Sequence, residues 1–299
     1  MIKKILNYGS LNIDRVYQVE HFVTPGETIS STKMDIFPGG KGLNQSIALA
    51  RAGADVYHAG TIGEDGLFLK EALEKSGVDC RYIEVSDSPT GHANIQVDKK
   101  GENAIILFKG SNFENSKDQM YKVIDDFSEG DVLVLQNEIN DIDYLMTLAK
   151  QKGMKIMLNP SPMNDELRNL DLSSVTWLIL NEVEGNALTG EQDKDKILKE
   201  LSQKYPDTAI ILTLGSNGAF YQDKNVTYFQ PCFECKVVDT TAAGDTFTGY
   251  FLAGIAAGLS QNDAMEQAAM AASIAVSRVG ASSSIPDYEE VVGQINNHN

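Results

Sequence analysis

The stretch Asp239-Thr-Thr-Ala-Ala-Gly-Asp245-Thr-Phe-Thr-Gly249 is the most informative part of the chain. It follows a strand-like run at residues 236–238 and leads into a helix of small residues that we expect from 246 to about 258. Where a strand turns into a helix, the first backbone N–H groups have no partners and lie at the positive end of the helix dipole. The stretch therefore predicts a strand, a turn that binds an anion, and a helix.

Asp245 lies inside this turn. A carboxylate beside an anion site is the arrangement needed to move a phosphoryl group onto a hydroxyl. An acid in the first turn of a helix also favours the helix dipole without any catalytic role. Taken alone, the stretch is compatible with both interpretations.

Outward from this stretch, short apolar runs alternate with segments of helical spacing. Strand-like runs occur at 2–8, 56–61, 80–85, 132–136, 155–159, 177–181 and 209–214, and helical segments at 43–52, 67–76, 142–152 and 194–205. This βαβα order predicts an α/β fold with a mostly parallel, doubly wound, Rossmann-like sheet flanked by helices.

Two segments break the alternation. Residues 15–37 hold a Pro25-Gly26 turn between β-prone pieces, and residues 90–110 hold the turn Lys99-Lys-Gly-Glu102. Both are typical of antiparallel hairpins. We therefore expect one domain over residues 1–299, with a small β-sheet lid formed by roughly 15–37 and 90–110.

The composition limits the partners of the protein. Its net charge of −17 repels nucleic acid and anionic membranes, so neither is expected as a partner. No window reaches the roughly 18 apolar residues of a membrane span. Cys232 and Cys235 form a single CxxC with no second pair, which is weak evidence for a metal site. The low cysteine content suits a reducing cytoplasm.

Two further motifs lie near the N-terminus. Asn12 and Asp14 follow the first strand and point to the same face of an extended chain, where they could bind vicinal hydroxyls or form a turn. The run Gly39-Gly40-Lys41-Gly42-Leu-Asn44-Gln45 precedes a helix. Its glycines allow a ligand to approach the backbone closely, although a flexible connector has the same composition.

Together these motifs resemble a known family. The glycine run is similar to the first signature of the ribokinase-like (PfkB) sugar kinases, and the stretch 239–247 is similar to the second, about 200 residues later. The resemblance covers essentially the whole chain and is greatest to the ribokinase branch. The segments between the signatures also match, at Thr24-Pro-Gly-Glu27, Asn159-Pro-Ser-Pro162, Asn181-Glu-Val-Glu184 and Thr213-Leu-Gly-Ser-Asn-Gly218.

The resemblance implies roles for individual residues. Asp245 would remove the proton from the sugar's primary hydroxyl, and the amides of Ala242, Ala243 and Gly244 would hold the phosphoryl charge. The sugar-binding residues would be Asn12, Asp14, Gly40, Lys41, Asn44 and Glu138, with Ala93, Ile95 and Leu107 of the lid covering the sugar.

The resemblance also implies nucleotide and metal sites. Asn181 and Glu184 would organise Mg²⁺ and phosphates, Thr213, Gly215 and Gly218 would hold the nucleotide, and Ala268 and Ala271 would contact adenine. A potassium ion would be held by Asp239, Thr241, Ala275, Arg278, Gly280 and Ser284.

The family implies ATP-dependent phosphorylation of a sugar, D-ribose at O5, by a homodimer that pairs through its lids. Ile106 and Phe108 would alternate away from Ile105 and Leu107 toward the partner. The lid departs from the family pattern at His92 and Asn94, so a nucleoside, a deoxyribose or a ketohexose remains an alternative substrate. A non-catalytic binding protein of this fold is a further alternative.

Overall fold

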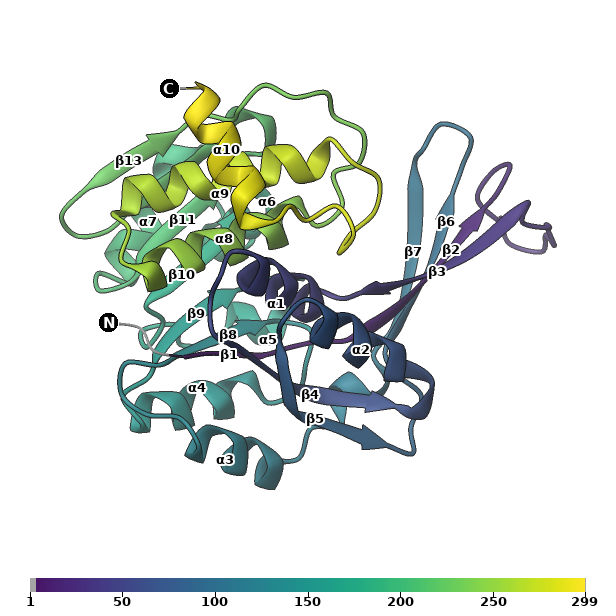
Figure 1. Cartoon of the computed structure of the whole chain (residues 1–299), viewed down its shortest axis with the longest axis horizontal. Coiled ribbons are helices and arrows are strands. Elements are labelled where there is room, and N and C mark those ends of the chain that lie inside the picture. The colour runs from purple at the N-terminus through teal and green to yellow at the C-terminus, as the bar shows by residue number, and fades with distance from the viewer. Residues whose placement is uncertain (1–3, 299) are drawn as a thin grey trace.

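The computed structural model describes residues 4–298 and has three layers. A nine-stranded sheet lies between two layers of helices, and a four-stranded sheet projects from one side (Figure 1). The strands of the large sheet are β1 Ile5–Tyr8, β4 Val56–Gly63, β5 Asp79–Ser86, β8 Val132–Gln136, β9 Lys155–Asn159, β10 Trp177–Asn181, β11 Ala209–Thr213, β12 Ala219–Gln222 and β13 Thr227–Gln230.

The large sheet has the order β13-β12-β11-β10-β9-β8-β1-β4-β5. The strands from β5 to β11 in this order pair in parallel, and only β12 and β13 are antiparallel. The predicted mostly parallel, doubly wound sheet is thus confirmed. Residues 2 and 3 of the first predicted strand lie outside the described part of the chain.

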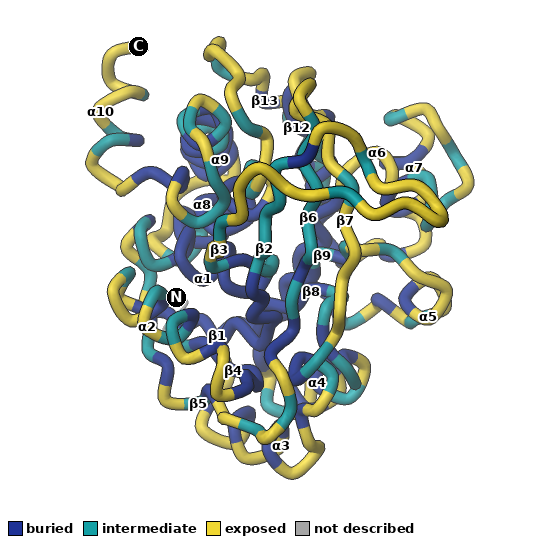
Figure 2. Tube along the Cα trace, turned by 90° about the vertical axis from the view of Figure 1, so that its right-hand side faces the viewer, coloured by how far each residue is buried: buried dark blue, intermediate teal, exposed yellow. Residues whose placement is uncertain are grey.

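Both faces of the large sheet are buried, as expected for parallel strands covered by helices (Figure 2). Side chains alternate between two cores along each strand. In β1, Ile5 belongs to one core and Leu6 to the other, and in β10 Ile179 and Leu180 divide in the same way. The period of two therefore sets which helix layer each strand residue contacts.

The helices occupy the two sides of the sheet. α1 (Lys41–Arg51), α2 (Leu67–Lys75), α8 (Ala243–Ala257), α9 (Gln261–Val276) and α10 (Tyr288–His298) pack on the core that contains Ile5. α3 (Lys117–Asp125), α4 (Ile142–Gln151), α5 (Asp165–Arg168), α6 (Glu182–Thr189) and α7 (Lys194–Lys204) pack on the core that contains Leu6.

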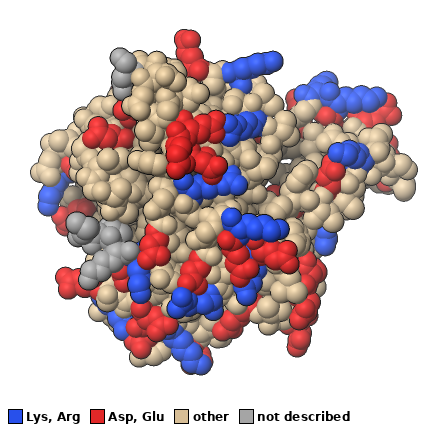
Figure 3. Space-filling view, viewed as in Figure 1, with Lys and Arg blue, Asp and Glu red and all other residues tan. Residues whose placement is uncertain are grey.

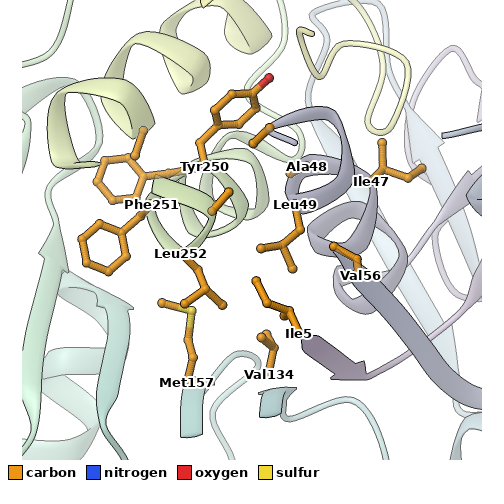
Figure 4. Close-up of a cluster of buried hydrophobic side chains, with 14 of the residues drawn as sticks. Ile5, Ile47, Ala48, Leu49, Val56, Val134, Met157, Tyr250, Phe251 and Leu252 are labelled. Atoms are coloured by element: carbon orange, nitrogen blue, oxygen red, sulfur yellow. The ribbon is translucent and has the colours of Figure 1, made fainter. Parts of the chain in front are cut away.

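α8 and α1 lie against each other, and Figure 4 shows Leu49 of α1 and Leu252 of α8 in the same cluster of buried side chains. A Cβ atom added at Gly249 would lie 2.4 Å from the Cβ of Ala48 and 2.8 Å from the backbone N of Leu49. Only glycine permits this approach. Since Gly249 follows Asp245 by one helical turn, the same face of α8 carries the carboxylate and the contact with α1.

The small sheet has the order β3-β2-β6-β7. Its strands are β2 Asn12–Gln18, β3 Lys33–Gly39, β6 His92–Val97 and β7 Asn103–Phe108. The two hairpins, β2–β3 and β6–β7, are antiparallel as expected, but they join through a parallel β2–β6 pair. The sheet projects away from the three-layered body (Figure 1).

The expected strand at 236–238 is not formed. This segment is irregular. Among the described residues, its only backbone hydrogen bond to another element runs from Val238 N to Val276 O. The side chains of Val237 and Val238 are exposed. No strand within residues 4–298 pairs with it. The following helix starts at Ala243, three residues earlier than expected, because the turn is already helical.

Acidic and basic side chains are interspersed over the face shown in Figure 3, with more acidic than basic ones on the chain as a whole. Within residues 4–298, no helix is long and apolar enough to cross a membrane.

Candidate active site

The candidate site lies where the order of the large sheet reverses around β1. The loops that follow β1 and its neighbour β8 supply Ser10 and Glu138, and the N-termini of α1 and α8 meet there. The carboxyl ends of parallel strands at such a reversal are the usual ligand sites of open α/β sheets.

Asp245 is buried at the third position of α8. Its Oδ2 accepts a hydrogen bond of 3.1 Å from Asn44 Nδ2, and its Oδ1 accepts one of 3.0 Å from Gln45 Nε2. Both donors come from the first turns of α1, so the two signature motifs meet at this carboxylate. A buried carboxylate held by two donors has a fixed orientation.

The turn before Asp245 presents backbone amides, including two of the three that were predicted. Ala242 has φ = 60°, a left-handed conformation, and its carbonyl already accepts from Thr246 N at 2.8 Å. Ala243 N donates to Thr240 O at 3.3 Å, so this predicted donor is engaged. Within the described chain, the amides of Ala242, Gly244 and Asp245 have no protein acceptor. The backbone N–H of Asp245 therefore takes the place that we assigned to Ala243.

Asp14 faces the same region from β2. A Cβ atom at Gly39, on the paired strand, would lie 2.1 Å from Asp14 Oδ2, so the glycine makes room for this carboxylate. Burial, and then the nearby charge of Glu138, raise the pKa of Asp14 to about 7. Within residues 4–298 the side chain of Asp14 has no hydrogen-bond donor. It is therefore a carboxylate ready to accept hydroxyl groups.

Glu138 is held by the first signature. Its Oε2 accepts from Ser10 Oγ at 2.5 Å and from the backbone N of Lys41 at 3.0 Å. Burial raises the pKa of Glu138, and the charge of Lys41 and the Ser10 hydrogen bond oppose that rise. Burial alone would lower the pKa of Lys41, but the charges of Asp245, Glu138 and Glu184 together raise it. Lys41 is thus a cation surrounded by three carboxylates.

Asn12 and Asn44 present amide groups to the same space. Asn12 Oδ1 accepts from Asn112 Nδ2 at 2.7 Å, which leaves the Asn12 amide nitrogen available to a ligand. Asn44 Oδ1 is buried without a partner. A buried polar atom without a partner is rare and costly, and a ligand hydroxyl would satisfy it.

The lid residues lie on the expected face. The register pairs Asp14 with Ala93 and Ala93 with Leu107, and Ile95 follows on the same face. Below them is a cavity of about 240 Å³, which Asn12, Glu138 and Leu107 line together with Asn112, Phe113 and Met163. Gly40 begins α1 with φ = 92°, a conformation that favours glycine.

A second cavity of about 240 Å³ is lined in part by the amide turn. It is lined by the predicted residues Asn181, Thr213, Gly215, Gly218, Ala243 and Gly244, and also by Cys232, Phe247, Ala269 and Ala272. The predicted contacts Ala268 and Ala271 do not line this cavity. Both side chains are fully buried in the core that contains Ile5.

Asn181 and Glu184 form a capping box at the start of α6. Glu184 N donates to Asn181 Oδ1 at 3.0 Å, and Asn181 N donates to Glu184 Oε2 at 2.8 Å. Glu184 is buried rather than solvated. Its other carboxylate oxygen has no hydrogen-bond donor among the described residues, so it can face the nucleotide cavity or a hydrated cation.

The predicted cation loops also meet. Asp239 Oδ1 accepts from Thr241 N at 2.9 Å and Oδ2 accepts from Gly280 N at 2.9 Å. Burial would raise the pKa of Asp239, but these hydrogen bonds, including one from the Thr241 hydroxyl, hold it below its usual range. Ala275 and Ser284, on either side of Gly280 in the sequence, are both buried. The Ala275 carbonyl accepts a hydrogen bond from Arg278 N.

Sequence reasoning missed four residues that hold the site together: Ser10, Gln45, Asn112 and Gln136. Gln45 belongs to the quoted glycine motif, and Gln136 is the polar last residue of an otherwise apolar strand, which marks the carboxyl end of a buried strand. Ser10 follows the first strand in the same way. We find no local signal for Asn112, which reaches Leu11 and Asn12 across 100 residues of chain.

A buried carboxylate next to bare amides at a helix N-terminus is the arrangement that a small-molecule kinase needs to transfer a phosphoryl group to a hydroxyl. Comparison with known proteins agrees. The model of the pfkB family carbohydrate kinases matches residues 2–288, and the chain belongs to this family.

Several of the similar proteins are named ribokinases. The chain is 36% identical to a ribokinase from Haemophilus influenzae, over 98% of both chains. The structure of a Cryptococcus neoformans ribokinase in complex with ADP is 34% identical, with a TM-score of 0.86 over 98% of this chain and 99% of that chain. An Arabidopsis thaliana ribokinase complexed with ribose and ATP is 30% identical, with a TM-score of 0.86 and 98% coverage of both.

Proposed function

We propose that this protein transfers the γ-phosphoryl group of ATP to the O5 hydroxyl of D-ribose. One observation carries the proposal: the surroundings of Asp245 connect the two cavities, because Gly244 lines one of them and Glu138, whose pKa responds to the charge of Asp245, lines the other. Gly244, directly before it, lines the nucleotide-type cavity, and Asn44, which binds it, belongs to the polyol side with Asp14 and Glu138. A sugar hydroxyl and a terminal phosphate would therefore meet at this carboxylate.

Different residues would bind the sugar, accept its proton and stabilise the transferred phosphoryl group. Asp14, Asn12, Glu138 and the free Asn44 Oδ1 would bind hydroxyls of the sugar, and Ala93, Ile95 and Leu107 would exclude water as the lid closes. Asp245 accepts the proton of the attacking hydroxyl. The amides of Gly244 and Asp245, with Lys41, stabilise the charge on the transferred group, and each such donor is typically worth ~3 kcal/mol in the transition state.

Two cations fit the residues present. Mg²⁺, with Glu184 and Asn181 near it, would neutralise charge on the nucleotide phosphates, and the free carboxylate oxygen of Glu184 suits a hydrated ion. A potassium ion beside Asp239 would be held mainly by backbone carbonyls of the 275–284 loop. We also propose that the enzyme acts in the cytoplasm, which its low cysteine content favours.

The experiment that tests the function is a steady-state assay of the purified chain with Mg·ATP and a panel of substrates. D-ribose should give the highest kcat/KM, ahead of deoxyribose, fructose and adenosine, and the product should be phosphorylated at O5. A higher kcat/KM for a nucleoside or a hexose would replace the substrate assignment. If the protein consumed no ATP with any of these substrates, the activity would be refuted.

The pKa of Asp14 predicts how sugar affinity depends on pH. A free-enzyme pKa of about 7 means that Asp14 is partly protonated at neutral pH. Only the ionised carboxylate accepts two hydroxyls, so the KM for ribose should rise about tenfold from pH 8 to pH 6. In Asp14→Asn the KM should be high at both pH values. The KM for ATP is the internal control, and a ribose KM that does not change would contradict the prediction.

We propose a homodimer that pairs through the small sheets. Ile106 and Phe108 lie on the face opposite Asp14, 66% and 47% exposed, and Met34 and Ile36 of β3 extend the apolar surface. Exposed apolar patches of this kind commonly mark interfaces. Light scattering at micromolar concentration should give a dimer mass, and Ile106→Asp should give a monomer. A monomeric wild-type protein would contradict the proposal.

A further inference from the structure

A chain of buried amide side chains runs from Asp245 into the core, away from both cavities. Gln45, whose Nε2 donates to Asp245, accepts at its Oε1 from Gln136 Nε2 at 2.8 Å. Gln136 Nε2 also donates to Asn7 Oδ1 at 3.0 Å. These three amides come from α1, β8 and β1, and all are at most 1% exposed.

The far end of this chain is tied to the backbone. Asn7 Nδ2 donates to Gly42 O at 2.8 Å and to Ser46 Oγ at 2.9 Å. Ser46 Oγ in turn lies 2.8 Å from His58 Nδ1. Burial lowers the pKa of His58 to about 4, so this imidazole is neutral and adds no charge to the network near neutral pH.

The Gly42 carbonyl fixes the direction of every hydrogen bond in the chain. A carbonyl oxygen can only accept, so Asn7 must present its NH₂ group to Gly42 and its oxygen to Gln136. Gln136 must then donate, and Gln45 must turn its oxygen toward Gln136. The NH₂ group of Gln45 is thereby left facing Asp245, which as a carboxylate can only accept.

Gln136 also destabilises the fold through one buried oxygen, and its own packing does not explain why a polar residue is kept there. Its Oε1 is buried without a partner, in contact with Gly9. A buried acceptor without a donor typically costs about 1–3 kcal/mol. An apolar residue, such as those that fill the rest of β8, would avoid this cost at that atom. Polar groups kept at such a cost are expected at functional sites.

We propose that Gln136 is a positioning residue for catalysis: it sets the amide orientation of Gln45, which in turn holds Asp245 in its reactive orientation. Gln136 lines neither cavity and acts only through Gln45. Without it, the Gln45 amide can rotate and turn its oxygen toward the carboxylate, which would repel Asp245 from its place. This inference rests on the proposed kinase activity.

The test is a double-mutant cycle measured on the full chain with ribose and Mg·ATP. Gln136→Met should lower kcat by about 10- to 100-fold with both KM values within threefold of wild type, because misplacing a reacting group costs about that much. The double variant Gln45→Met/Gln136→Met should have the kcat of Gln45→Met alone, within twofold. A purely structural role for Gln136 would instead give losses that multiply.

Gln119→Met is the matched control. Gln119 is also a buried glutamine with an unpaired amide nitrogen, but it lies on α3, outside the network. Its kcat should stay within twofold of wild type. If Gln136→Met does not fold, Asn7→Ser provides the second test, because it releases Gln136 while leaving the Gln45–Asp245 pair intact, and its kcat should fall in the same direction.

The outcomes separate the two hypotheses. A wild-type protein that phosphorylates no sugar refutes the proposed function. An active wild type together with a folded Gln136→Met variant of unchanged kcat, or with losses that multiply in the double variant, overturns the positioning role alone.

Discussion

Replacing Asp245 with asparagine should lower kcat by about 10²–10⁴-fold, while the KM for ribose and for ATP should change little. Asparagine has nearly the same shape but cannot accept the proton of the attacking hydroxyl. Its NH₂ group would also meet the NH₂ donor of Asn44 or Gln45, which hold the carboxylate at 3.1 and 3.0 Å. Substrate binding relies on other groups, so the loss should appear in kcat.

Asp263→Asn is the control for this prediction. Asp263 occupies the third position of α9, as Asp245 does in α8, and it too interacts with the helix dipole. Its replacement should cost less than ~1 kcal/mol of stability and leave kcat unchanged. If Asp245→Asn retained turnover near that of wild type, Asp245 would be only a first-turn acid, and the base would have to be sought elsewhere.

The large sheet could be predicted because its strands obey simple rules. Runs such as 132–136 and 209–213 are apolar without interruption, and a strand buried on both faces requires this. The place of Asp245 in the first turn of a helix could be predicted from one turn and its neighbours. In both cases the signal lies within a few consecutive residues, so no knowledge of distant contacts is needed.

The errors arose where the answer depends on distant contacts. β-prone residues at 236–238 form no strand, because no strand in the described part of the chain pairs with them. Positions 268, 269, 271 and 272 of α9 are all alanines, so the sequence does not distinguish which of them line the cavity. Gln136 meets Gln45 only after β8 pairs with β1, and such a pairing leaves no local trace.

Gly249→Ala should disable the enzyme although it lies outside both cavities. The new methyl group would lie 2.4 Å from Ala48 Cβ and within 3 Å of the backbone of α1, so the two helices must separate. Asp245 lies one turn away on the same face of α8, whereas Asn44 and Gln45 move with α1. A shift of about 1 Å between reacting groups can cost about 100-fold in rate, which is the fall in kcat that we expect.

The same substitution should also lower stability by about 1–3 kcal/mol through overpacking, against a gain of roughly 0.5–1 kcal/mol from the better helix propensity of alanine. Gly293→Ala in α10 is the matched control, because nothing lies within 4 Å of its added Cβ and only the propensity gain applies. Thermal unfolding and steady-state kinetics on both variants separate the two effects. Wild-type kcat in a folded Gly249→Ala variant would show that the α1–α8 distance does not set the geometry of Asp245.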